Sequence, residues 1–404
     1  MRGFIRTGLF LFVLLIIVVY YVLPPLFSKD YIFSKNAVTA SEDEEDLIPT
    51  VRHLNPPEPL KGIYMSACYA GSKELREGLA KLIDDTELNA IVIDIKDYSG
   101  KISFLPNDTW KPYLSDNCNA PDMKDFIQSL HDRNIYVIGR ITVFQDPFFA
   151  KQNPKEAVKK NSDKTAIWHD RKGISYLDPG SSVTLDHIVA LAKDSYDVGF
   201  DEINFDYIRF PSDGPMNDIY FPYSEGKSKP AVMEGVYKHL HDKLKPEGVV
   251  ISVDLFGMVT TNTDDLNIGQ TLESALPYFD FIDPMVYPSH YPSNFNGWKN
   301  PNTVPYELIH FVLASAVRRT EATSTLVSTF DGVYIASSTP KRYTKEAFDK
   351  YKIRPWLQDF DYGGNYGVAE VKAQIKATYD VGLDSFLMWD PSNKYTPAAF
   401  DKSI

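Results

Sequence analysis

The sequence predicts a (β/α)8 TIM barrel with loop insertions, preceded by an N-terminal transmembrane helix. From residue 60 onward, eight strand-like segments alternate with amphipathic helices, which is typical of a parallel sheet. Eight such units over about 345 residues indicate that the sheet closes into a barrel. An open doubly wound sheet is the alternative. That class favours a glycine-rich phosphate-binding turn after an early strand, and the sequence contains no such turn.

The N-terminal segment predicts a membrane anchor. An almost unbroken apolar run covers residues 8–23, and Arg2 and Arg6 precede it. This charge asymmetry favours a cytoplasmic N-terminus and an extracytoplasmic location for the rest of the chain. The run is close to the minimum length of a membrane span, so we expect an uncleaved signal anchor over residues 1–27. A cleaved secretion signal followed by release of the domain is the alternative.

Residues 28–59 predict an extended linker, because they hold an acidic block and end in a proline-rich stretch. The barrel domain is expected over residues 60–404. Its predicted strands are 61–67, 89–97, 135–144, 199–211, 249–258, 279–288, 353–360 and 384–390. The predicted helices are 72–86, 123–134, 181–199, 231–248, 268–279, 305–322 and 367–382.

The bulk composition limits the possible partners and cofactors. A net charge of −12 over 404 residues disfavours nucleic acid and anionic membrane surfaces, because both require a basic patch. Apart from membrane contact through the anchor, we therefore expect a carbohydrate partner. The two cysteines, Cys68 and Cys118, match no zinc-binding pattern, so we expect neither a metal nor another cofactor. Whether they form a disulfide is left open by the sequence.

The fourth predicted strand carries an unusual row of polar residues. Ile203 and Phe205 alternate with Asn204 and Asp206, and Arg209 follows. A polar row in a strand buried on both faces is costly unless it is used. Because barrel enzymes carry their chemistry at the C-terminal ends of the strands, we expect the polar residues found there to line one mouth. The candidate substrate-binding residues are Asp97, Arg140, Asn204, Arg209, Tyr287, His290, Trp356, Gln358, Trp389 and Asp390.

Asp206 and Asp254 are the candidate catalytic pair. They end consecutive predicted strands, and neighbouring strands lie about 4.8 Å apart. Carboxyl groups roughly 5–9 Å apart cover both arrangements used in glycoside hydrolysis. We expect Asp206 to act as nucleophile or base and Asp254 as acid. An aspartate at a strand end also commonly accepts hydrogen bonds from a loop, so a non-catalytic barrel that binds a glycan or a partner at the envelope is the alternative.

Several stretches of the domain resemble a bacterial barrel family that was long described as a domain of unknown function and is assigned as glycoside hydrolases. The stretches are KGIYMSA, AIVIDIKDYSG, FDEINFDYIRFP, SVDLFGM, DPMVYPSHY, RPWLQDF and FLMWDPSN. This family is distantly akin to the alpha-amylase-type hydrolases. The resemblance covers about residues 60–395 and implies sugar hydrolysis. Together with the predicted anchor, it implies action on an envelope or extracellular polysaccharide.

The chain is also similar to chitinase-type barrels, but it lacks their catalytic acid. The fourth strand of those barrels carries the pattern D-x-x-D-x-D-x-E. Here Asp201, Asn204 and Asp206 are followed by Ile208 at the position of the glutamate. The chitinase mechanism therefore does not carry over. The general acid is expected on another strand, which favours Asp254.

Overall fold

The computed structural model describes residues 51–330, 332–336 and 338–402. The predicted anchor over 1–27 and most of the predicted linker lie outside the described residues. Among the helices that are described, none is long and apolar enough to cross a membrane. The compact unit that holds the barrel begins at Val51.

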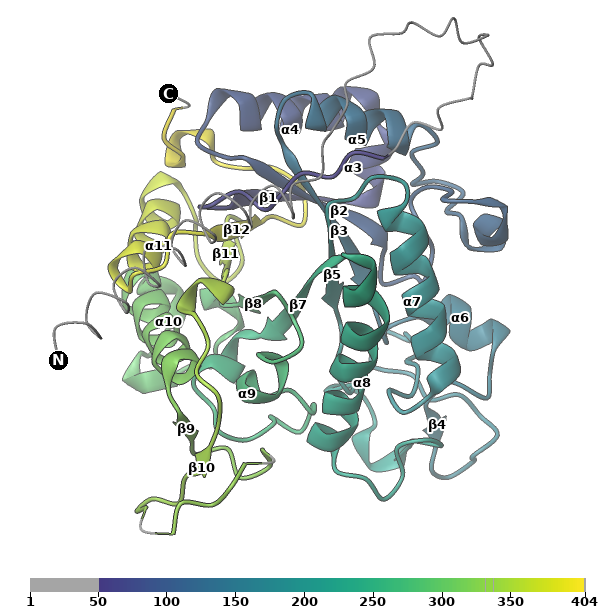
Figure 1. Cartoon of the computed structure of the whole chain (residues 1–404), viewed down its shortest axis with the longest axis vertical. Coiled ribbons are helices and arrows are strands. Elements are labelled where there is room, and N and C mark those ends of the chain that lie inside the picture. The colour runs from purple at the N-terminus through teal and green to yellow at the C-terminus, as the bar shows by residue number, and fades with distance from the viewer. Residues whose placement is uncertain (1–50, 331, 337, 403–404) are drawn as a thin grey trace, which may run out of the picture. The chain divides into compact units, whose positions relative to one another are not determined.

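Eight parallel strands close into a barrel (Figure 1), which confirms the predicted TIM barrel. In barrel order the strands are β1 (Lys61–Met65), β2 (Ala90–Lys96), β3 (Tyr136–Thr142), β5 (Glu202–Asp206), β7 (Val250–Phe256), β8 (Phe281–Met285), β11 (Trp356–Gln358) and β12 (Phe386–Trp389). All eight predicted strands are present, and each is shorter than its sequence pattern. Two additional two-stranded sheets lie in the insertions and are formed by β4 (Lys159–Lys160) with β6 (Ile219–Tyr220), and by β9 (Ser324–Thr325) with β10 (Tyr343–Thr344).

The helices connect successive strands and cover the outside of the barrel (Figure 1). They are α3 (Ala67–Gly71), α4 (Lys73–Asp85), α5 (Met123–His131), α6 (Pro147–Gln152), α7 (Ser182–Tyr196), α8 (Lys229–Leu244), α9 (Leu272–Ala275), α10 (Pro305–Glu321) and α11 (Val368–Asp380). Side-chain caps fix several helix starts. The Ser181 hydroxyl, for example, accepts a hydrogen bond from Thr184 N at 3.1 Å and begins α7.

The fifth predicted helix, 268–279, is only the single turn α9, so this prediction was too long. Gly269, with a φ of 82°, lies in a turn that delays the helix start until Thr271 caps it. Pro277 follows closely and cannot donate the backbone hydrogen bond that a longer helix needs.

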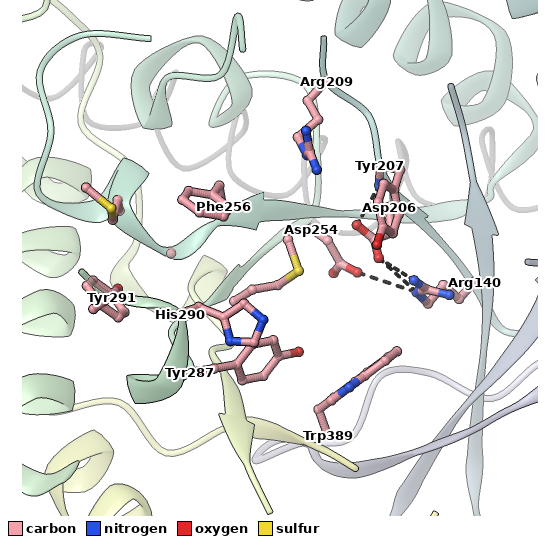
Figure 2. A pocket seen from close by; sticks show the side chains of 13 residues that line it. Arg140, Asp206, Tyr207, Arg209, Asp254, Phe256, Tyr287, His290, Tyr291 and Trp389 are labelled. Carbon is pink, nitrogen blue, oxygen red and sulfur yellow. Dashed lines mark hydrogen bonds and ion pairs between the residues drawn. The ribbon is translucent and has the colours of Figure 1, made fainter. Parts of the chain in front are cut away.

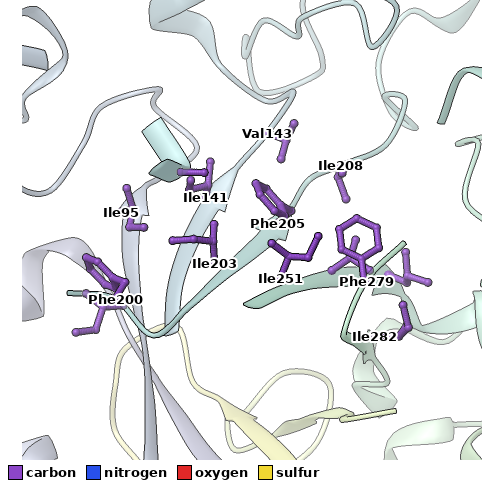
Figure 3. Packing of buried hydrophobic residues seen from close by; sticks show 14 of the residues in the cluster. Ile95, Ile141, Val143, Phe200, Ile203, Phe205, Ile208, Ile251, Phe279 and Ile282 are labelled. Carbon is purple, nitrogen blue, oxygen red and sulfur yellow. The ribbon is translucent and has the colours of Figure 1, made fainter. Parts of the chain in front are cut away.

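The two faces of β5 separate as the alternation predicts. Ile203 and Phe205 point outward into the main hydrophobic cluster between the strands and the helices (Figure 3). Glu202, Asn204 and Asp206 point into the barrel, where other strands supply their hydrogen-bond partners. The barrel interior at β5 is therefore polar along its whole length, and the main hydrophobic cluster lies outside the sheet. A smaller cluster of buried apolar residues, which includes Val92, Ile138 and Trp356, is formed by inward-facing positions of other strands.

The last residues of the predicted linker pack against the N-terminal side of the barrel. The His53 ring stacks on Tyr196 with centroids 3.9 Å apart. Leu54 N donates to Asp201 Oδ1 at 2.6 Å, and His131 Nε2 lies 3.0 Å from Asp201 Oδ2. The folded unit therefore begins about nine residues before the predicted boundary at residue 60.

Cys68 and Cys118 form a disulfide, which resolves the alternative left open by the sequence. Their Cα atoms lie 4.2 Å apart, and 50 positions separate them in the chain. The bond ties α3, directly after β1, to the loop that follows β2. It therefore joins two of the loops at the C-terminal rim of the barrel.

Candidate active site

A pocket of about 210 Å³ lies at the C-terminal ends of the barrel strands (Figure 2). Seven residues predicted for the site line it: Arg140, Asp206, Arg209, Asp254, Tyr287, His290 and Trp389. Six further residues complete its wall: Tyr207, Phe256, Gly257, Met258, Met285 and Tyr291. The predicted convergence of several strands on one mouth is thus found in the structure.

Arg140, on β3, is the centre of the carboxylate cluster. Its Nη1 donates to Asp94 Oδ1 at 2.6 Å, and both its Nη2 and its Nε donate to Asp206. Its Nε lies 3.2 Å from Asp206 Oδ2 and 3.9 Å from Asp254 Oδ2. The separation of these two oxygens cannot exceed the sum of the two distances, 7.1 Å. This upper bound is below the largest carboxylate separations found in glycoside hydrolases, about 9.5 Å.

Asp254, two residues before the end of β7, is buried, and one of its oxygens accepts hydrogen bonds from two donors. Asn204 Nδ2 donates to its Oδ1 at 2.9 Å, and Trp356 Nε1 donates to the same atom at 2.8 Å. Burial raises the pKa of Asp254 well above its usual value, and the nearby charges of Asp206 and Asp283 raise it further, against the opposing effect of Arg140. Because Oδ1 is occupied by N–H donors, Oδ2 is the atom that can hold the proton of the neutral acid.

Asp206 ends β5 and is fixed by the backbone turn that follows it. Tyr207 N donates to Asp206 Oδ1 at 2.5 Å. Tyr207 has a φ of 48°, in the left-handed region that an aromatic residue rarely adopts, at a cost of about 1–3 kcal/mol. The turn holds the Asp206 carboxylate against Arg140 and brings the Tyr207 ring into the pocket wall.

A second ionic cluster lies inside the barrel, below the pocket. Arg354, directly before β11, donates to both oxygens of Asp283 at 3.0 and 2.9 Å and to both oxygens of Glu202 at 3.1 and 2.5 Å. Asn204 Nδ2 connects this cluster to Asp254, because it lies 3.2 Å from Asp283 Oδ2. Burial raises the pKa of Asp283 to about 6, although the Arg354 guanidinium opposes the shift.

Aromatic side chains form one side of the pocket. Trp389 stacks on Tyr64, with ring centroids 3.9 Å apart, and the Arg140 guanidinium lies 5.2 Å from the Trp389 ring. The Tyr64 hydroxyl donates to Asp94 Oδ2 at 2.6 Å. Burial raises the pKa of Tyr287 well above its usual value, and the charges of Asp254 and Asp206 add to the shift, so its hydroxyl stays neutral. These groups offer stacking surfaces and hydrogen bonds of the kind that bind a sugar ring.

His290 lies at the pocket edge as a neutral imidazole. Its Nδ1 is 2.9 Å from the Ser289 hydroxyl, and burial lowers its pKa. Within the described residues, no group of three or more His, Cys, Asp or Glu side chains is arranged to hold a metal ion.

The structure does not bring five of the predicted substrate-binding residues to the pocket. Asn204 and Trp356 lie beneath it and contact Asp254 instead. The other three accept hydrogen bonds from backbone amides. Gln358 Oε1 accepts from Ser289 N of the loop after β8 at 3.1 Å, whereas Asp390 Oδ1 and Asp97 Oδ1 accept from Ser392 N at 2.5 Å and Ser99 N at 2.8 Å, two positions later in their own loops.

Sequence reasoning missed Tyr64, Asp94 as a partner of Arg140, and Arg354. Tyr64 and Asp94 lie on inward-facing positions of β1 and β2, and the same alternation that selected Asn204 and Asp206 was the available signal. Arg354 precedes its short strand, and no periodic pattern marks it.

Comparisons with known proteins identify the fold and the family of the chain. A hypothetical protein from Ruminiclostridium thermocellum ATCC 27405 is 31% identical over 48% of this chain and 96% of that chain, with a TM-score of 0.42. The PgaB (BpsB) glycoside hydrolase domain from Bordetella bronchiseptica is 14% identical over 82% of this chain and 94% of that chain, and its TM-score of 0.57 shows a shared fold. None of the curated proteins matches the chain. Residues 62–395 match the family model described as "Putative glycosyl hydrolase domain", and the chain therefore belongs to this family, as the sequence resemblance implied.

Proposed function

We propose that the protein hydrolyses an O-glycosidic bond of an envelope or extracellular polysaccharide, with Asp254 as the acid and Asp206 as the nucleophile or base. One observation carries the proposal. Two buried carboxylates at the ends of neighbouring strands share a single guanidinium, Arg140, and face the same pocket. This arrangement supplies the two carboxyl groups that most glycoside hydrolases require.

The environments of the two carboxylates suit them to different roles. Burial and like charges keep the Asp254 carboxyl neutral, so that it can protonate the oxygen of the leaving sugar from Oδ2. Asp206 accepts two N–H donors from Arg140. As a carboxylate it can attack the anomeric carbon or take a proton from the attacking water, and Arg140 stabilises the same charge in either step.

The pocket volume of about 210 Å³ is below the roughly 300–1,000 Å³ of typical small-molecule sites. It therefore suits a single sugar ring, which can stack against Trp389, while the rest of a polysaccharide extends outside. A disulfide between Cys68 and Cys118 supports an oxidising compartment. With the apolar run at residues 8–23, this favours a membrane-tethered enzyme whose domain lies outside the cytoplasm.

The proposal is tested with the soluble domain, residues 51–404, on a panel of envelope and extracellular polysaccharides. Release of reducing ends is compared for the wild-type domain, Asp206→Asn, Asp254→Asn and the surface control Asp85→Asn, whose exposed carboxylate pairs with Lys81 on α4. We expect losses of at least about 100-fold in the two pocket variants and none in the control. Full activity in either pocket variant contradicts the assignment. Glycan binding without hydrolysis by the wild-type domain favours the non-catalytic alternative.

A further inference from the structure

Arg209 is a cation of the pocket wall that has no carboxylate partner in the part of the chain that the structure describes. Arg140 shares the same wall, but it is ion-paired with Asp94 and Asp206. His290 is the third basic side chain there, and burial lowers its pKa so that it is uncharged near neutral pH. Figure 2 shows the Arg209 side chain pointing toward the pocket from the segment that follows Asp206. Arg209 therefore supplies a positive charge that forms no ion pair with any acidic side chain among the described residues.

One edge of the Arg209 guanidinium is free. Nη1 donates to Phe210 O at 3.2 Å and to the Ser212 hydroxyl at 3.1 Å, which uses both of its hydrogens. Nε and Nη2 have no acceptor among the described residues. These two nitrogens form the edge that binds a carboxylate through two parallel N–H···O bonds. The free group thus has the shape of a carboxylate receptor as well as the charge.

The backbone holds Arg209 at a fixed place relative to the catalytic pair. Gln270 Nε2 donates to Ile208 O at 3.2 Å, and Phe210 N donates to Ile268 O at 3.0 Å, so both neighbours of Arg209 are tied down. The same Gln270 nitrogen lies 3.4 Å from the backbone oxygen of Asp254. A guanidinium that is positioned in advance loses little entropy when it binds its ligand.

We infer that the substrate carries carboxylate groups, as hexuronic acid units do, and that Arg209 binds one of them next to the bond that is cleaved. This inference rests on the proposed glycoside hydrolase function. A chain with a net charge of −12 repels a polyanionic glycan, and a cation placed at the reaction pocket offsets that repulsion where the substrate must bind. A neutral polysaccharide would leave the charged edge of Arg209 without a partner.

The test compares a hexuronic acid oligosaccharide with its carboxyl-reduced counterpart, which has the same linkages and no charge. Kd and, where hydrolysis occurs, KM and kcat are measured for the wild-type domain, Arg209→Gln, Arg209→Lys and the exposed control Arg318→Gln. We expect the wild-type domain to bind the acidic form about 10- to 100-fold more tightly than the reduced form. Arg209→Gln should remove this preference by raising the Kd and KM for the acidic form. Arg209→Lys should keep part of the preference, and Arg318→Gln should keep all of it.

The two proposals fail in different ways. The role of Arg209 is overturned, and the hydrolase function is left intact, by one set of results. In that set the domain hydrolyses neutral glycans, binds the acidic form no more tightly than the reduced form, and is unaffected by Arg209→Gln. Binding of the acidic form through Arg209 with no hydrolysis of any glycan contradicts the hydrolase function and supports the carboxylate site. Equal affinity for both forms in wild type and Arg209→Gln overturns the inference whether or not hydrolysis is found.

Discussion

Replacing Trp356 with Phe tests how the protein controls the proton on Asp254. Trp356 is fully buried, and its Nε1 donates to Asp254 Oδ1 at 2.8 Å. The substitution removes this donor and keeps an aromatic ring in place, while Asn204 Nδ2 still donates to the same oxygen at 2.9 Å. The change is therefore confined mainly to one hydrogen bond.

The size of the effect follows from the two charge states of Asp254. A hydrogen bond to a charged group contributes about 1.5–3 kcal/mol, and one between neutral groups about 0.5–1.5 kcal/mol. Loss of the Trp356 donor should therefore destabilise the ionised form by about 1 kcal/mol more than the neutral form. The pKa of Asp254 then rises further, and the acid stays protonated to a higher pH. A difference of about 1 kcal/mol corresponds to a rise of about 0.7 unit in the pKa of Asp254.

The assay is the pH dependence of kcat/KM, whose alkaline limb reports loss of the proton from the acid. We expect this limb to move to higher pH in Trp356→Phe. Trp110→Phe is the matched control, because Trp110 is also buried and its Nε1 donates to Asp194 at 2.6 Å, a carboxylate that does not line the pocket. An unchanged limb in Trp356→Phe, a shift to lower pH, or an equal shift in Trp110→Phe would refute the reasoning.

Three further predictions concern stability. Cys68→Ser combined with Cys118→Ser should lower the free energy of unfolding by about 2–4 kcal/mol, because the disulfide closes a long loop; a Tm that is the same with and without reductant contradicts this. Burial, assisted by the Lys96 charge, lowers the pKa of His187 to about 3, so the unfolded chain binds this proton more tightly and stability is lost as pH falls from 6.5 toward 3. Between pH 7 and pH 4, the free energy of unfolding measured in urea titrations should therefore fall by about 2–3 kcal/mol less in His187→Phe than in wild type. Equal decreases in the two proteins would exclude His187 as the cause. Arg140→Met should lower the free energy of unfolding by about 3–5 kcal/mol in the same titrations at pH 7, because it leaves the Asp206 charge buried without its partner. An unchanged urea midpoint would show that this ion pair is not needed for stability.

The sequence predicts the barrel and the pocket rim because both depend on simple periodicity. Alternation in β5 places Asn204 and Asp206 inside the barrel, and the ends of parallel strands meet at one edge. These two rules bring Arg140, Asp206 and Asp254 together, although they lie far apart in the chain. The disulfide remained open because spacing alone does not show that Cys68 and Cys118 lie on neighbouring loops.

Alternation does not predict depth along the barrel axis. Trp356 and Gln358 lie two positions apart on β11, and both were predicted to bind substrate, but neither lines the pocket. Trp356 lies one layer below and donates to Asp254, and Gln358 bonds to the loop after β8. Arg354 was missed because its two acidic partners come from other strands, and such a pairing depends on the barrel stagger.

The central claim is that Asp254 donates the proton and Asp206 performs the attack or activates water. The most direct measurement compares Asp254→Asn and Asp206→Asn on two substrates with the same sugar, a natural glycan and an aryl glycoside whose nitrophenolate leaving group needs no proton. We predict that Asp254→Asn loses about 100- to 10,000-fold on the glycan and much less on the aryl glycoside, whereas Asp206→Asn loses activity on both. Equal losses on the two substrates in Asp254→Asn, or an active Asp206→Asn, would contradict the account.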